Sequence, residues 1–285
     1  MLLTALLNGL AFGGYVYILS SGLGIAFGLM RVVNLSHGAL YLLGGYIGLS
    51  ILRSTASWSL GLVGGAVSMA VVAIFLERSL LNLKQVRGNA FMETLITLGV
   101  AYIIAEIGLI FWGGRPLRVV GPAVLSRPIR VFGVPFSFYR LVVFFIAVAL
   151  ILALWLVLKK TKIGMMIRAG IDDIEITKNL GINTTFLFGA VFALAGFLAG
   201  AAGIIGGTMS MLAPGEDWRA LMFSVVAVLL GGLGTFWGTV LASFVVGLLY
   251  SFGTFFFPQF SLFVLFVPVA LIIMVRPYGL FGREK

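Results

Sequence analysis

Long apolar segments recur along the whole chain and constrain its fold more than any other feature. Of the 285 residues, 61% are hydrophobic and only 10% are charged, whereas about a quarter of the residues of a soluble domain are charged. A helix needs about 20 residues to cross the ~30 Å hydrocarbon core of a bilayer. The candidate segments are Leu2–Leu29, Leu40–Leu52, Ser57–Leu76, Phe91–Trp112, Leu141–Leu158, Thr185–Gly207, Ala220–Leu233, Gly238–Phe257 and Ser261–Val275. The chain is therefore predicted to be an integral membrane protein.

These segments predict an all-α polytopic bundle of eight or nine transmembrane or re-entrant helices, in one domain covering residues 1–285. Each segment is apolar around its circumference, and helices satisfy the backbone of such a segment in lipid. Leu40–Leu52 and Ala220–Leu233 are too short for a straight crossing, which is typical of broken or re-entrant helices. The 38 glycines indicate close helix packing. No internal repeat is visible in the sequence.

The composition excludes several chemistries. Without cysteine, the chain forms no disulfide, iron–sulfur cluster or thiol nucleophile. Its single histidine, His37, cannot build a histidine-rich metal site. No lysine completes a G-x-x-x-x-G-K-[ST] phosphate loop, so we expect no ATP bound in that way. The formal charge of +10 is expected to anchor helix ends to membrane lipid and not to bind nucleic acid.

The basic residues predict the orientation of the chain. Counting segments places residues 77–90, residues 159–183 and the C-terminal tail on one side, and residues 113–140 on the other. The first side carries Arg78, Lys84, Arg87, Lys159, Lys160, Lys162, Arg168, Lys178, Arg276, Arg283 and Lys285, and the second carries Arg115, Arg118, Arg127, Arg130 and Arg140. The more basic side is expected to be cytoplasmic. Residues 159–183 are then a cytoplasmic loop, residues 113–140 a periplasmic loop, and the N-terminus lies outside.

The periplasmic loop combines four prolines with its five arginines. Alternation of apolar and other residues over 129–134 predicts a short β-hairpin. Such a loop either receives a partner or simply connects two helices, and the pattern leaves both open.

Residues 159–183 contain apolar residues at mixed three- and four-residue intervals. They are Met165, Met166, Ile167, Ile171, Ile174 and Leu180. This spacing predicts a short amphipathic helix or helix pair, which Gly181 ends as the residue after the C-cap. The helices are either a connector on the membrane surface or a docking element for a cytoplasmic partner.

The polar turn Asn34–Gly38 separates two apolar segments. Ser36 is expected to cap the following helix. The free N–H groups near His37 and Ala39, with the helix dipole, would then favour an anion such as a carboxylate. The alternative is an ordinary capped turn with a hydrogen-bonded histidine.

Two glutamates fall within the fourth apolar segment. A carboxylate inside a span is costly, so Glu106 is expected either to face an interior cavity or partner, or to pair with Arg115 or Arg118. Glu93 lies near the start of the segment and is expected to be a structural residue facing Arg87.

The stretch Asn34-Leu35-Ser36-His37-Gly38 resembles the N-F-A-H-G signature of the branched-chain amino acid ABC importer permeases, the LivH/LivM family, with Leu35-Ser36 in place of Phe-Ala. The resemblance covers nearly the whole chain. It includes Asn8-Gly9-Leu10, Ile163-Gly164, Arg168-Ala169, Leu180-Gly181-Ile182, Gly231-Gly232-Leu233-Gly234 and the run from Arg276 to Gly282.

The resemblance implies an ABC importer permease fold and a multi-pass protein of the bacterial or archaeal plasma (inner) membrane. It implies a non-enzymatic subunit that moves branched-chain or other hydrophobic amino acids, or related small polar solutes, inward by alternating access. The implied partners are a second homologous permease, two cytoplasmic ATPases and a periplasmic substrate-binding protein. No cofactor is expected on this chain, because ATP and magnesium would bind the ATPases.

The resemblance also suggests which residues act. Asn34, Ser36, His37, Gly38 and Glu106 are expected along the substrate path, and Ile163, Gly164, Arg168, Ala169, Asp172, Ile174 and Gly181 in the element that couples to the ATPases. A secondary transporter or channel for small solutes remains the alternative class.

Overall fold

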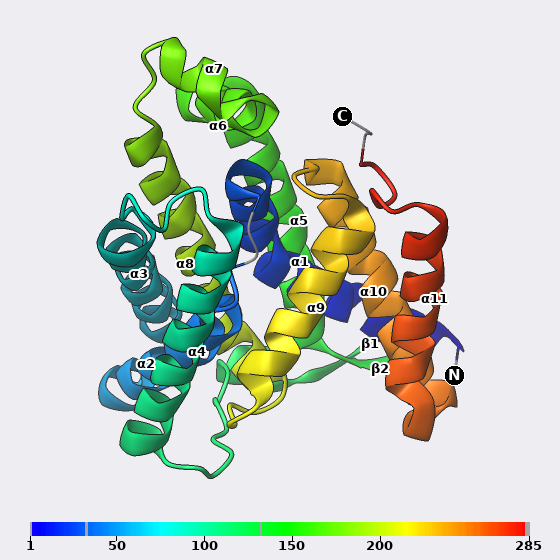
Figure 1. Ribbon diagram of the computed structural model, residues 1–285. Helices are drawn as coiled ribbons and strands as arrows, with labels where there is room; N and C mark the ends of the chain where they lie inside the picture. Colours follow the sequence, from blue (N-terminus) through cyan, green and yellow to red (C-terminus); the bar gives the residue numbers. More distant parts are fainter. Residues whose placement is uncertain (1, 32–33, 132, 283–285) are drawn as a thin grey trace.

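The computed structural model describes residues 2–31, 34–131 and 133–282, and this part of the chain folds into a bundle of helices (Figure 1). Its eleven α-helices are α1 (Leu2–Met30), α2 (His37–Thr55), α3 (Trp58–Leu76), α4 (Ala90–Trp112), α5 (Phe138–Lys160), α6 (Lys162–Asp172), α7 (Ile174–Asn179), α8 (Thr184–Met209), α9 (Glu216–Gly231), α10 (Phe236–Phe256) and α11 (Ser261–Val275). All nine predicted apolar segments are helical. Short helices also occur at η1 (Glu77–Leu81), η2 (Ala123–Ser126) and η3 (Pro258–Phe260).

Seven helices of the described chain are long and apolar enough to cross a membrane. They are α1, α3 with η1, α4, α5, α8, α10, and η3 with α11. The two remaining apolar helices, α2 and α9, correspond to the two segments predicted to be short. Helix α9 is short, with 16 residues, but α2 has 19 residues and is longer than the predicted Leu40–Leu52, because it begins at His37 and ends at Thr55. The prediction of an all-α polytopic membrane protein is confirmed.

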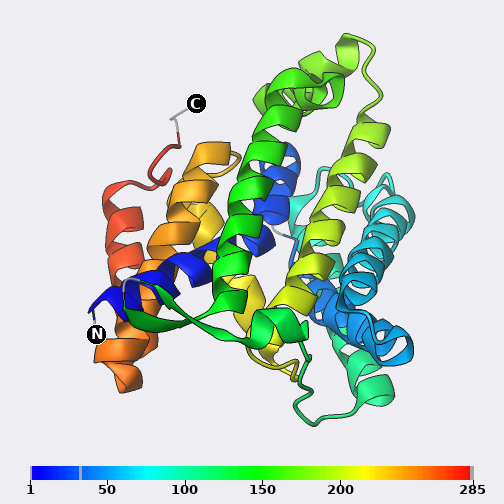
Figure 2. The ribbon, with the colours of Figure 1, turned by 180° about the vertical axis from the view of Figure 1, so that it is seen from behind.

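Different elements lie at the two ends of the bundle. Helices α6 and α7 lie at one end, which we call the coupling end, and the described C-terminal segment finishes there too (Figure 1). Strands β1 (Pro128–Val131) and β2 (Val134–Ser137) form the predicted antiparallel hairpin at the opposite end, near the N-terminus (Figure 2). We call this the hairpin end. Of the basic tail, Arg283 and Lys285 lie outside the described residues.

The chain contains two matching halves, α1–α4 and α8–α11. Each half consists of a long helix, a shorter one and two further spans. Helix α1 packs most extensively on α10, α8 packs most extensively on α3, and the two short helices pack on each other. Helix α1 runs toward the coupling end and α8 runs away from it (Figures 1 and 2). This arrangement is an inverted-topology repeat, although the sequence shows no repeat.

Glycines hold the crossing helices together at backbone distance. A Cβ atom added at Gly44 of α2 would lie 2.5 Å from Cα of Gly200 in α8, and one added at Gly22 of α1 would lie 2.6 Å from Cα of Ala195. Only glycine allows such an approach. Close packing of small residues replaces the hydrophobic driving force that membrane helices lack among themselves.

Candidate functional site

Helices α6 and α7 at the coupling end are shaped by their caps. The Thr161 side chain accepts a hydrogen bond from the Gly164 N–H at 3.0 Å and begins α6. Asp173 ends α6 and caps α7, because its carboxylate accepts the N–H groups of Glu175 at 2.9 Å and Ile176 at 3.0 Å. The chain therefore turns sharply between the two helices, and the predicted helix pair is confirmed.

Gly181 ends the pair as the sequence predicts. Its φ angle is +81°, a left-handed conformation that favours glycine. Its N–H donates to the Lys178 carbonyl at 3.0 Å, and the N–H of Ile182 donates to the Thr177 carbonyl at 3.4 Å. These two bonds form a Schellman motif.

The inner side of α6 rests on α1. Gly170 is buried on this side, whereas Gly164 is buried against the end of α5. A Cβ atom at Gly170 would lie 2.6 Å from Cδ1 of Leu29, and one at Gly28 of α1 would lie 3.3 Å from Cδ1 of Ile171. Helix α6 is therefore in direct contact with the end of α1.

The outer side of the pair is apolar and exposed. We define the outer coupling face as Ile176 and Leu180, four residues apart at the end of the pair, which are 58% and 72% exposed. Ile163 and Met165 of α6 are also exposed, at 43% and 53%, on opposite sides of that helix. Exposed apolar clusters of this kind mark interaction sites. Of the other predicted coupling residues, Arg168 and Asp172 are exposed, whereas Ala169 and Ile174 are partly buried. All seven predicted coupling residues thus lie on α6, on α7 or in the motif that ends α7.

The turn before α2 is a buried cluster of hydrogen-bonded polar groups. Asn34 Oδ1 accepts both the N–H of Ser36 at 3.0 Å and its hydroxyl at 2.6 Å. The N–H of His37 donates to the Asn34 carbonyl at 3.2 Å. Ser36 does occupy the N-cap position, but the prediction that its side chain caps α2 is wrong. Its backbone is helical (φ −74°, ψ −7°), whereas a capping residue is normally extended, and its hydroxyl is turned toward Asn34. The N–H groups of Ser36 and His37 are already used within the turn.

His37 is completely buried and hydrogen-bonded. Its Nε2 lies 2.8 Å from the carbonyl oxygen of Leu19 in the middle of α1, which places the proton on Nε2. Gly38 packs so closely on the start of α9 that an added Cβ would lie 2.1 Å from the Asp217 carbonyl oxygen. The turn therefore lies where the two halves meet.

Glu106 is separated from this turn. The turn contacts α4 at Thr97, whose hydroxyl oxygen accepts the N–H of Leu35 at 3.2 Å. Glu106 lies nine residues further along α4, about 14 Å at 1.5 Å per residue. It is exposed, and within the described residues it forms no ion pair with Arg115 or Arg118.

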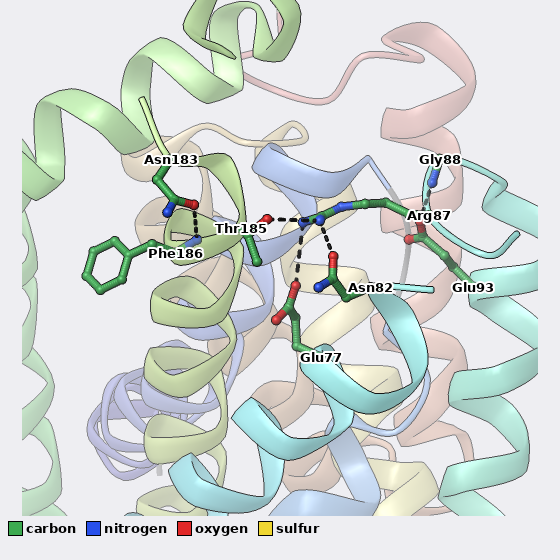
Figure 3. Close-up of polar contacts among 8 residues, drawn as sticks. All are labelled: Glu77, Asn82, Arg87, Gly88, Glu93, Asn183, Thr185 and Phe186. Atoms are coloured by element: carbon green, nitrogen blue, oxygen red, sulfur yellow. Dashed lines mark hydrogen bonds and ion pairs between the residues drawn. The ribbon is translucent and has the colours of Figure 1, made fainter. Parts of the chain in front are cut away.

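The sequence interpretation missed a polar network centred on Arg87 (Figure 3). The Arg87 guanidinium lies 3.5 Å from a carboxylate oxygen of Glu77 and donates to the side chains of Asn82 and Thr185, the latter at 3.4 Å. It also lies 4.4 Å from the ring centroid of Phe188. Arg87 thus ties the connection between α3 and α4 to the start of α8.

Glu93 is buried beside Arg87, as the sequence predicts, but forms no ion pair with it. Its carboxylate accepts the Gly88 N–H at 2.8 Å (Figure 3), and Arg87 pairs with Glu77. A cavity of about 730 Å³ separates this network from the helix pair and is lined by Arg87, Glu93 and Asp173, among others. No sequence pattern identifies the network, because its members come together only on folding.

An all-α bundle with inverted halves and an amphipathic helix pair at one end defines a polytopic membrane transport protein. The family described as the branched-chain amino acid transport system permease component matches residues 5–275, and the chain belongs to this family. It is therefore a permease subunit of an ABC importer and a multi-pass plasma-membrane protein. The family is one of transport components, not of known enzymes.

Curated relatives match over almost the whole chain. It is 25% identical to the high-affinity branched-chain amino acid transport system permease protein BraD of Pseudomonas aeruginosa, over 99% of this chain and 96% of the relative. It is 22% identical to the permease protein LivH of Salmonella typhimurium and to that of Escherichia coli K12, with the same coverage. No solved structure matches the chain.

Proposed function

We propose that this chain forms, with a second homologous permease, the path by which branched-chain or other hydrophobic amino acids, or related small polar solutes, enter the cell. Two ATPases that hold ATP and magnesium drive alternating access, and a periplasmic binding protein delivers the substrate. This chain itself carries no cofactor. Relatives named as branched-chain amino acid permeases support the substrate class.

The α6–α7 pair is the observation that carries this proposal. Its outer coupling face is the surface to which an ATPase docks, and its inner side contacts the end of α1. ATPase closure would push α6 and thereby shift α1 relative to α10 and α8. The coupling end is then cytoplasmic and residues 113–140 are periplasmic, as the distribution of basic residues favours.

We assign the substrate path to the junction of the two halves and to one face of α4. In transporters with inverted repeats, substrate sites lie between the repeats, near the ends of discontinuous helices. The turn from Asn34 through Ser36 and His37 to Gly38 lies at this junction. Glu106 places a carboxylate on an exposed side of a span, where lipid is a costly neighbour. That side of α4 therefore faces the second permease or the path.

Charged residues on the outer coupling face test the docking assignment. We expect Ile176→Asp and Leu180→Asp to reduce co-purification of the ATPases, and ATP-driven leucine uptake into proteoliposomes, at least tenfold. The matched control is Val124→Asp at the hairpin end, where Val124 is 68% exposed. Normal ATPase binding and uptake in both coupling variants would refute the assignment. Uptake that does not depend on ATP but stops when the ion gradient is dissipated would indicate a secondary transporter.

The same uptake assay tests the turn. If Ser36→Ala and His37→Ala both fold and leave leucine uptake unchanged, the turn does not belong to the path.

A further inference from the structure

A cavity opens at the hairpin end, away from every residue that the sequence suggests as functional. Its volume is about 310 Å³, within the range of small-molecule sites. It lies between α1, α5, α8 and α10, and its lining includes Asn8, Phe12, Tyr15, Arg140, Ser210 and Tyr250. A neighbouring cavity of about 440 Å³ shares Arg140 with it.

Arg140 brings a positive charge to this cavity. It is the third residue of α5 and is partly buried. Its guanidinium donates a hydrogen bond to the side-chain oxygen of Asn8. No carboxylate of the described residues forms an ion pair with it, since the pairs found there are Arg87–Glu77 and Arg219–Glu216. A guanidinium has five N–H donors, so most of those of Arg140 remain available to an anion.

The cavity also offers acceptors for an ammonium group. Ser210 donates its hydroxyl proton to the Gly206 carbonyl at 3.0 Å, and Ser251 donates to the Ala5 carbonyl at 2.7 Å. Because these protons are already used, the hydroxyl oxygens present lone pairs. The cavity can therefore accept both charges of a zwitterion.

The remaining wall is aromatic. The rings of Phe12 and Tyr250 stack with their centroids 4.6 Å apart, and Tyr15 lies against Phe12 at 5.5 Å. This wall suits an apolar tail, whereas Arg140, which also lines the cavity, suits a carboxylate, which it can bind in a bidentate manner.

We propose that this cavity is an outer binding site for a small amphipathic α-amino carboxylate, with its carboxylate on Arg140 and its apolar tail against Phe12 and Tyr250. The inference rests on the proposed function and names the substrate class of the permease. It places a first binding step at the hairpin end, before the path opens inward.

The lack of native cysteine makes a direct test possible. Thr254→Cys places one thiol in the lining of the cavity of the complete complex, and its labelling rate with a maleimide reports occupancy. The probes are leucine, 4-methylpentanoate, which lacks the ammonium group, and leucinol, which lacks the carboxylate. We expect leucine to slow labelling at least threefold, 4-methylpentanoate to slow it less, and leucinol to leave it unchanged.

Charge variants complete the test. Arg140→Gln should abolish the protection by leucine, whereas the matched control Arg130→Gln, an exposed residue of β1, should preserve it. Phe255→Cys, also in the cavity lining, serves as a second reporter if Thr254→Cys perturbs folding. Equal protection by leucinol, or protection that survives Arg140→Gln, would overturn the proposal. Labelling that responds only to anionic lipid would overturn it in favour of a lipid phosphate.

Uptake measured in the same proteoliposomes separates this proposal from the function on which it rests. Leucine protection without ATP-driven uptake would contradict the proposed function alone. ATP-driven leucine uptake without protection would contradict the binding site alone.

Discussion

The two halves of the bundle share an architecture but differ in their connections. Between α3 and α4, the chain forms η1 and the buried pair of Glu77 with Arg87, where Glu77 is 1% exposed. Between α10 and α11, the three-residue helix η3 is exposed; Phe257 precedes it and Phe260 is its last residue. The first connection faces the α6–α7 pair across a cavity. The comparison teaches that close glycine packing occurs in both halves, whereas the buried ion pair lies in the connection that faces the coupling end.

The starts of the two short helices differ in the same way. Helix α2 begins with the buried, hydrogen-bonded pair of Asn34 and Ser36 and with the buried His37. Helix α9 begins with an ion pair of Glu216 and Arg219 at 2.9 Å, in which the Arg219 side chain is 60% exposed. The two starts contact each other at Gly38 and Asp217, but the start of α9 also carries a partly exposed ion pair.

Arg87→Gln should have the largest effect. It removes the cation that compensates the buried carboxylate of Glu77, and breaking a buried pair costs about 3–5 kcal/mol. We expect the free energy of unfolding to fall by about 3 kcal/mol, the lower end of this range, because the Arg87 side chain is 30% exposed and water reaches it. Denaturant unfolding of the purified chain in detergent measures the change. If Arg87→Gln lowers the free energy of unfolding no more than Arg219→Gln does, the connection between α3 and α4 is not stabilised by a buried ion pair.

Gly38→Ala should have an intermediate effect. The added methyl group would lie 2.1 Å from the Asp217 carbonyl oxygen, and overpacking of this kind costs about 1–3 kcal/mol. The matched control is Gly99→Ala in α4, where an added Cβ meets nothing within 4 Å. Because alanine is the better helix former, that control should be neutral or stabilising by up to about 1 kcal/mol. Equal thermal midpoints for the two variants would show that the halves are not in contact at Gly38.

Arg219→Gln should have the smallest effect. Exposed ion pairs contribute about 0.2–1 kcal/mol, and the Arg219 side chain is mostly exposed. The unfolding midpoint should therefore change little, and added salt should reduce even that difference. If Arg219→Gln lowers the free energy of unfolding as much as Arg87→Gln does, the ion pair at the start of α9 is not solvent-exposed in the purified chain.

Local patterns made much of the chain predictable. The nine apolar segments, the α6–α7 pair and the end of α7 at Gly181 follow from hydrophobicity, spacing and caps within a few residues. The cap prediction for Ser36 failed because its backbone is helical and its hydroxyl is turned toward Asn34. The residue types alone do not specify the backbone conformation of this turn.

The sequence by itself determined that this chain is a helical membrane protein with an amphipathic pair at one end, because these properties are local. The tertiary structure alone decided the inverted repeat, the Arg87 network and the Arg140 cavity. Arg87 meets Thr185 across 98 residues, and Arg140 meets Asn8 across 132. Such contacts depend on which helices cross. The crossings depend on how the glycine-lined surfaces of the helices fit together, and a local sequence pattern does not show which surface packs on which.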